Sequence, residues 1–214
     1  KLVPLEVPPP AVGDRDVLVR VHACALNHLD LWVREGLPGL KLQMPHIPGC
    51  DVAGEVVELG SKTTYPAKGA RVAVNPGRWC GACEWCIRGE HPLCPEYKIM
   101  GEHTPGGYAE FVSVPAANCV ELPTDFDYVE AAAAPLVYQT AWRALITRAR
   151  IRPGEDVLVL GAGSGVSTAA IQIAKLTGCT VYVTSSSDEK LRRAKEIGAA
   201  VLINHRQMEF DKAV

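Results

Sequence analysis

A glycine-rich turn between a predicted strand and a predicted helix constrains the fold of this chain more than any other feature. The apolar run at 157–160 is typical of a strand covered on both faces, and the turn at 161–165 follows it directly. The pattern continues with a strand at 181–184, a helix at 188–197 and a strand at 201–203. Strands and helices that alternate in this order predict a parallel sheet, and therefore an α/β fold for the C-terminal part of the chain.

The turn itself predicts a site for a dinucleotide. In the order strand, glycine turn and helix, backbone amides and the helix N-terminus can hold a pyrophosphate. The pattern G-x-G-x-x-G is incomplete because Val166 stands at the third glycine position, so a plain tight turn is the alternative. The order of the surrounding elements favours binding. The candidate residues are Gly161, Gly163, Ser164, Gly165 and Val166.

The segment after the second of these strands is predicted to select the cofactor. An acidic side chain there would bind the ribose hydroxyls of NAD and repel the 2′-phosphate of NADP. The sequence has small hydroxyl residues instead, and basic residues follow them. We therefore expect NADP(H) to be favoured over NAD(H), with Ser185, Ser186 and Lys190 in contact with the cofactor. The alternative is a solvated basic helix face without a role in binding.

The N-terminal part of the chain is predicted to be mostly β-structure. Apolar and polar residues alternate in short runs that Gly and Pro separate, which is the period of half-buried strands. Such runs lie at 16–23, 52–59, 70–75 and 108–114. The composition changes after Leu122, and we expect two domains, 1–122 and 123–214.

Four of the eight cysteines are concentrated in the segment 80–94: Cys80, Cys83, Cys86 and Cys94. From one compact loop, four thiolates can converge on a tetrahedral ion, for which zinc is the natural choice. A closed set of four sulfurs leaves no position for substrate, so the predicted zinc is structural. Four unrelated core cysteines or two disulfides are the alternative. The uneven cysteine placement predicts a reduced, cytoplasmic compartment.

Composition and charge exclude several classes of partner. Lys and Arg total 22 against 24 Asp and Glu, and the net charge is −2, which does not favour nucleic acid or an anionic membrane. No apolar run approaches the ~20 residues of a bilayer-spanning helix. With 48% hydrophobic residues the chain is an ordinary globular protein.

Together, the β-rich domain, the four-cysteine lobe and the glycine turn resemble the medium-chain dehydrogenase/reductase superfamily, which includes zinc alcohol dehydrogenases and quinone oxidoreductases. The resemblance implies an N-terminal GroES-like domain joined to a Rossmann domain, with the active site in the cleft between them. It also implies NAD(P)H-dependent hydride transfer with a small-molecule substrate as partner, and a homo-oligomer, either a dimer or a tetramer. Family-like segments outside the lobe and the turn are 27–30, 49–56, 107–111 and 140–142.

The catalytic zinc ligands of the alcohol dehydrogenases are not retained. The resemblance places a Cys at Asn27, a His at Cys50 and a second Cys near Leu136, and these three residues hold the metal in that group. An amide and a leucine cannot replace two thiolates. A zinc-dependent alcohol dehydrogenase with an altered site, in which Cys50 and Asp51 bind the metal, is one alternative.

The pattern Asn27-x-x-Asp30 is similar to the zinc-free quinone oxidoreductase branch instead. In that branch the cofactor supplies hydride to a carbonyl, enone or quinone, and the protein supplies position and a proton. Asn27 is the candidate hydrogen-bond donor to the substrate oxygen, and His28 or Asp30 is the candidate proton source. Each of these residues could instead have a purely structural role. Asn27 could cap a turn, Asp30 could cap a helix N-terminus, and His28 could be a packing residue. A cofactor-binding scaffold without turnover is a further hypothesis.

A complete doubly wound dinucleotide domain has two halves, and the sequence ends after the third predicted strand. We therefore expect the chain to be part of a longer enzyme and to bind cofactor weakly by itself.

Overall fold

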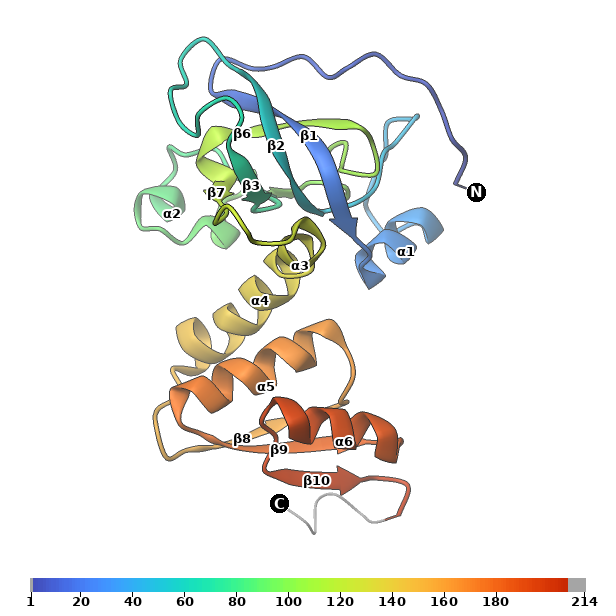
Figure 1. The fold of residues 1–214 in the computed structure, drawn as a ribbon, viewed down its shortest axis with the longest axis vertical. Coiled ribbons are helices and arrows are strands. Elements are labelled where there is room, and N and C mark those ends of the chain that lie inside the picture. The colour runs from blue at the N-terminus through green and yellow to red at the C-terminus, as the bar shows by residue number, and fades with distance from the viewer. Residues whose placement is uncertain (1, 208–214) are drawn as a thin grey trace. The chain divides into compact units, whose positions relative to one another are not determined.

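The computed structural model describes residues 2–207, which form two separate units (Figure 1). The first unit ends at Leu136 and the second begins at Val137. Each unit has its own sheet and its own buried apolar cluster. The mostly β first part and the α/β second part expected from the sequence are both present.

The first unit is built on a five-stranded sheet with the strand order β6-β1-β2-β3-β7. All neighbouring strands are antiparallel. The strands are β1 (Asp16–Ala25), β2 (Asp51–Leu59), β3 (Arg71–Val74), β6 (Phe111–Pro115) and β7 (Cys119–Glu121). The four alternating runs of the sequence correspond to β1, β2, β3 and β6, whereas the short β7 was not predicted. Burial alternates along β3 and β6 because successive side chains point to opposite faces, but the first four residues of β2 are all buried.

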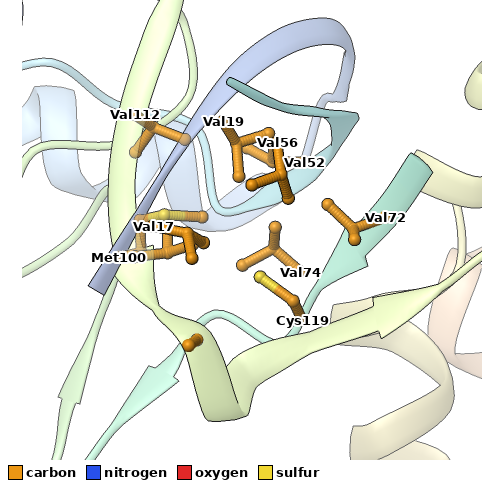
Figure 2. Packing of buried hydrophobic residues seen from close by; sticks show 11 residues of the cluster. Val17, Val19, Val52, Val56, Val72, Val74, Met100, Val112 and Cys119 are labelled. Carbon is orange, nitrogen blue, oxygen red and sulfur yellow. The ribbon is translucent and has the colours of Figure 1, made fainter. Parts of the chain in front are cut away.

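Valine dominates the core of the first unit, where side chains from neighbouring strands meet (Figure 2). Val17 and Val19 of β1 are both fully buried. β-branched side chains suit a pleated, buried surface, and burying each one stabilises the fold by about 1.5–3 kcal/mol. The other labelled members are Val52, Val56, Val72, Val74, Met100, Val112 and Cys119.

Short elements surround this sheet. The cysteine segment lies between the two strands of a small hairpin-like sheet, β4 (Gly77–Arg78) and β5 (Lys98–Ile99). The other short elements are α1 (His28–Glu35), α2 (Glu84–Ile87), the 3₁₀ turns η1 (His91–Leu93) and η2 (Ala116–Asn118), and α3 (Tyr128–Ala132). Ala131 and Ala132 of α3 pack against Ala53, so α3 belongs to the first unit.

The second unit has the predicted α/β order. Its sheet is parallel, with the strand order β10-β9-β8, and the helices α5 and α6 cover one face of it (Figure 1). The elements are β8 (Asp156–Val159), α5 (Gly165–Thr177), β9 (Thr180–Ser185), α6 (Asp188–Ile197) and β10 (Val201–Asn204). Ile171 and Ala174 of α5 pack onto Val181 and Val183, which holds the glycine turn at the end of β8.

Two further helical segments precede β8. They are α4 (Pro135–Trp142) and the π-helical turn η3 (Arg143–Ala149), which ends at Arg150 with φ +55°. Within residues 2–207, no helix combines the length and the apolar composition that crossing a membrane requires.

Candidate functional site

The four cysteines of the segment 80–94 converge as predicted. Their sulfur atoms all lie within 4.8 Å of one another, and none of the four forms a disulfide. The Sγ atom of Cys86 is 3.5 Å from that of Cys83 and 3.8 Å from that of Cys80. A zinc ion at about 2.3 Å from four tetrahedral sulfurs requires separations of about 3.8 Å. The arrangement therefore fits a tetrahedral zinc ion.

Backbone amides of the loop stabilise the thiolate form of Cys80, which is the form that binds a cation. The amides of Ala82 and Cys83 donate hydrogen bonds to Cys80 Sγ, at 3.5 and 3.4 Å. These bonds lower the pKa of Cys80 to about 7, because N–H donors favour the thiolate. Burial raises the pKa of Cys86 to about 12, so its ionised form needs a nearby cation.

The carboxylate of Asp30 is a junction between three segments. It accepts hydrogen bonds from the backbone amide of Asn27 at 2.7 Å, from the backbone amide of Gly49 at 3.1 Å and from the Tyr108 hydroxyl at 2.7 Å. Asp30 is buried, and burial together with this carboxylate raises the pKa of Tyr108. These contacts hold the start of α1 against the segments around Gly49 and Tyr108.

The resemblance connects four positions with a catalytic metal site, and these positions lie close together in the first unit. They are Asn27, Cys50, Asp51 and Leu136. Asn27 Nδ2 donates to Asp51 Oδ2 at 2.9 Å and lies 3.5 Å from Cys50 Sγ. The Leu136 amide donates to Asp51 Oδ1 at 2.8 Å. Asp51 is only 1% exposed, and burial raises its pKa. The two hydrogen bonds lower the pKa, but burial has the larger effect, and the resulting pKa is about 6.

This group does not fit a metal ion. Both oxygens of Asp51 are occupied by donors, and burial raises the pKa of the Cys50 thiol, which disfavours the thiolate that a metal requires. In the part of the chain that the structure describes, the cluster of Cys80, Cys83, Cys86 and Cys94 is the one group of three or more potential ligands that converges.

His28 lies outside this hydrogen-bonded group. It is exposed at the start of α1, and its ring centroid is 6.2 Å from that of Trp32, which is also exposed. The structure therefore brings Asn27 and Asp30 together through the start of α1 and leaves His28 at the surface of the unit.

The glycine turn of the second unit is fixed by β9. The Gly161 amide donates to Thr184 Oγ1 at 3.1 Å, and the Ala162 amide donates to the Thr184 carbonyl oxygen at 2.7 Å. Gly161 and Gly163 have φ of +79° and +97°, a conformation that glycine adopts without a steric penalty. Ser164 then caps α5, since its Oγ accepts from the Ser167 amide at 3.0 Å.

Close packing explains which residues of the turn must be glycine. A Cβ atom on Gly165 would lie 2.8 Å from Val137 Cγ1, so this glycine permits the close approach of α4 to α5. Val166, at the third glycine position of the motif, is 39% exposed, which is why a valine is accommodated there. A Cβ on Gly163 would lie 2.9 Å from Lys190 Cδ, so the predicted site residues Gly163 and Lys190 do come together.

The predicted cofactor-selecting segment is partly engaged in the fold. Ser185 is buried, and its Oγ accepts from the Ser187 amide at 3.2 Å. Arg192 and Arg193 both form ion pairs with Glu189 at 2.9 Å. Within residues 2–207, the side chains of Ser186 and Lys190 show no such hydrogen bond.

Sequence reasoning missed two residues of these sites. Tyr108 follows a glycine pair, and its link to Asp30 joins residues 78 positions apart, so no local pattern indicated it. Thr184 directly precedes Ser185 and Ser186, for which the sequence predicts cofactor contacts, but its own hydroxyl is bonded to the glycine turn.

Comparison with known proteins agrees with this architecture. Residues 13–124 match the alcohol dehydrogenase GroES-like domain, and residues 165–214 match the zinc-binding dehydrogenase family. The chain belongs to the medium-chain dehydrogenase/reductase superfamily.

Three relatives illustrate the similarity. An alcohol dehydrogenase of Geobacillus stearothermophilus is 36% identical over 98% of this chain and 61% of its own length. The human quinone oxidoreductase is 32% identical over 94% of this chain and 53% of its own length. The crystal structure of an NAD-dependent alcohol dehydrogenase has a TM-score of 0.94 and 48% identity, covering 98% of this chain and 61% of that one. The chain thus spans 53–61% of the length of these relatives.

Proposed function

We propose that this chain acts in an NAD(P)-dependent oxidoreductase that transfers hydride to or from a carbonyl, enone or quinone substrate. The glycine turn is the observation that carries the proposal. The residues at the start of α5 are exposed, so their backbone amides are available to a pyrophosphate. The Lys190 side chain lies close to Gly163, which brings a cation to the same turn. The nicotinamide of a bound cofactor would supply the hydride chemistry.

A single structural zinc, held by Cys80, Cys83, Cys86 and Cys94, is part of the proposal. Metal analysis of the full-length protein is expected to return one zinc per chain, with loss of that zinc in Cys94→Ser. Cys179→Ser is the matched control, because Cys179 lies outside the cluster, and it is expected to keep the metal. A second zinc bound near Cys50 and Asp51 would favour a zinc-dependent alcohol dehydrogenase instead.

In the first unit, we propose that Asn27 and His28 face the substrate, with Asp30 supporting them or delivering the proton. Support comes from the half-buried position of Asn27 and the exposed position of His28. Asn27→Ala and His28→Ala are each expected to lower kcat/KM by about 10²-fold, within the range found for acid–base and oxyanion-type contributions. The kcat/KM of each variant is measured from the rate of NADPH oxidation with a quinone, an enone and an aldehyde as substrates. No turnover with any of them, despite NADPH binding, would favour a scaffold.

The preference for NADP(H) over NAD(H) stays a prediction that rests on Ser186 and Lys190. Lys190→Ala is expected to weaken NADPH binding by about tenfold and NADH binding by less than about threefold, because the lost cation faces the extra phosphate. Titration calorimetry on the full-length protein measures both. Equal loss for the two cofactors would place Lys190 at the shared pyrophosphate, and tighter binding of NADH by the unaltered protein would contradict the preference.

A cytoplasmic location and a homodimer or homotetramer complete the proposal. The eight free cysteines support a reducing compartment. Light scattering on the full-length protein tests the oligomeric state.

A further inference from the structure

Thr184 lies in β9 and connects that strand to the turn that follows β8. It is 4% exposed, and its hydroxyl and its carbonyl oxygen accept hydrogen bonds from two successive amides, those of Gly161 and Ala162. The two residues that it contacts are the first two of the turn, so Thr184 determines where the chain leaves the sheet.

The remaining part of the turn differs in its hydrogen bonds. Gly161 and residues 163–166 are all exposed and Ala162 is buried, but it is the amides of Gly161 and Ala162 that are bonded to Thr184. The first backbone bond of α5 runs from the Thr168 amide to the Ser164 carbonyl oxygen, and the amides of Gly165 and Val166 precede it. The amides of the turn are therefore divided between those that hold the turn to β9 and those that are available to a ligand.

We propose that Thr184 is a positioning residue of the cofactor site, whose hydroxyl fixes the first amide of the glycine turn so that the amides at the start of α5 are preformed for a pyrophosphate. This inference rests on the proposed dinucleotide binding. Gly161 has a positive φ and open space at the Cβ position, so the hydrogen bond to Thr184 restrains a residue that side-chain packing leaves free. Preorganisation of this kind improves affinity because less ordering remains for the binding step.

The experiment compares three variants of the full-length protein. Thr184→Val removes the hydroxyl and keeps the side-chain shape, whereas Thr184→Ser keeps the hydroxyl and removes the methyl group. Thr180→Val, at the exposed start of the same strand, is the control for the change from Thr to Val. Competition titrations measure binding of NADPH, of ADP, which contains the pyrophosphate, and of adenosine, which does not.

Thr184→Val is expected to weaken NADPH and ADP binding by about 5–10-fold, the effect of one hydrogen bond. The same variant is expected to bind adenosine within about twofold of the unaltered protein. The affinity for NADPH is likewise expected to stay within about twofold in Thr184→Ser and in Thr180→Val. Unchanged NADPH affinity in Thr184→Val overturns the proposal. So does equal loss in Thr184→Ser and Thr184→Val, because the methyl group and not the hydroxyl would then matter. Failure of the unaltered protein to bind any nicotinamide cofactor would overturn the proposed function itself.

Hydrogen exchange tests the same contact without relying on a ligand. In the cofactor-free protein, the Gly161 amide is expected to exchange slowly and to lose that protection in Thr184→Val but not in Thr180→Val. If Thr184→Val does not fold, the exchange rate of the Gly161 amide in the unaltered protein still tests whether the turn is preformed. A Gly161 amide that exchanges as fast as an exposed loop, before any cofactor is added, contradicts a preformed turn.

Discussion

Two buried carboxylates in the first unit have different surroundings, and their roles follow from this difference. Asp30 accepts three hydrogen bonds, from Asn27, Gly49 and Tyr108, which is a set that an ionised carboxylate satisfies. Asp51 accepts two, from Asn27 and Leu136, and is more deeply buried. Asp30 therefore joins segments of the fold, whereas Asp51 holds the Asn27 side chain.

Asp30→Asn is expected to destabilise the protein by about 2–3 kcal/mol, because an amide offers one acceptor oxygen where three donors converge. Tyr108→Phe, which removes one of those donors, is expected to cost about 1 kcal/mol. Urea unfolding measures both variants. A loss of turnover in Asp30→Asn without loss of stability would support Asp30 as a proton donor and contradict its supporting role.

The stability of the protein is expected to fall as the pH rises through the titration of Asp51. Its pKa is about 6 in the folded protein against 3.8 ordinarily, because burial disfavours the charged form. Between these values the folded state binds more protons than the unfolded state, so the free energy of unfolding decreases by about 2 kcal/mol from about pH 4 to pH 6.

Asp51→Asn is expected to lack this decrease. Asp156→Asn, a change at an exposed carboxyl of β8, is expected to retain it. Urea unfolding at intervals between pH 4 and pH 7 measures the slope, and equal slopes in the Asp51 variant and the unaltered protein would contradict the assignment.

Among the secondary-structure elements, α5 contributes most to the proposed cofactor site. Ser164 caps it through the Ser167 amide at 3.0 Å, while Ser187 caps α6 through the Lys190 amide at a longer 3.4 Å. Gly165 then allows α5 to pack closely on Val137. The start of α5 is thereby held on one side by its cap and on the other by helix packing.

Ser164→Ala is expected to destabilise the protein by about 1 kcal/mol, and Ser187→Ala by less, because its capping bond is longer. Ser164→Asp separates capping from binding. Aspartate is a good cap, so stability is retained, but its charge repels a pyrophosphate and is expected to weaken NADPH binding by about tenfold or more. Urea unfolding and cofactor titration measure the two effects. NADPH binding that is unaffected by the Asp substitution would place the phosphates elsewhere.

At the scale of the whole molecule, the two units have separate cores, so a change in one need not spread to the other. The cysteine segment is a local test of this. It lies between β4 and β5, which are only two residues long each, and its other regular elements are the short α2 and η1. A bound metal would therefore supply much of the order in this segment.

Chelation of the zinc is expected to increase hydrogen exchange in the segment 77–99 and to leave the segment 156–204 unchanged. Mass spectrometry of deuterium uptake before and after treatment with a chelator measures both segments. The same increase in both segments would show that the metal supports the entire chain. No change in either would argue against a metal at the four cysteines.

The parallel order of the C-terminal elements, the β-rich character of the first unit and the meeting of the four cysteines were predictable from the sequence alone. Their signals are local, because periodicity, turn residues and ligand spacing all act between near neighbours along the chain. Only the tertiary structure decided that Asp30 binds Tyr108, 78 positions away, and that Asp51 binds Leu136, 85 positions away. These contacts depend on how strands, loops and helix ends pack, and a shift of one residue in the register of β2 would turn Asp51 to the other face of the sheet.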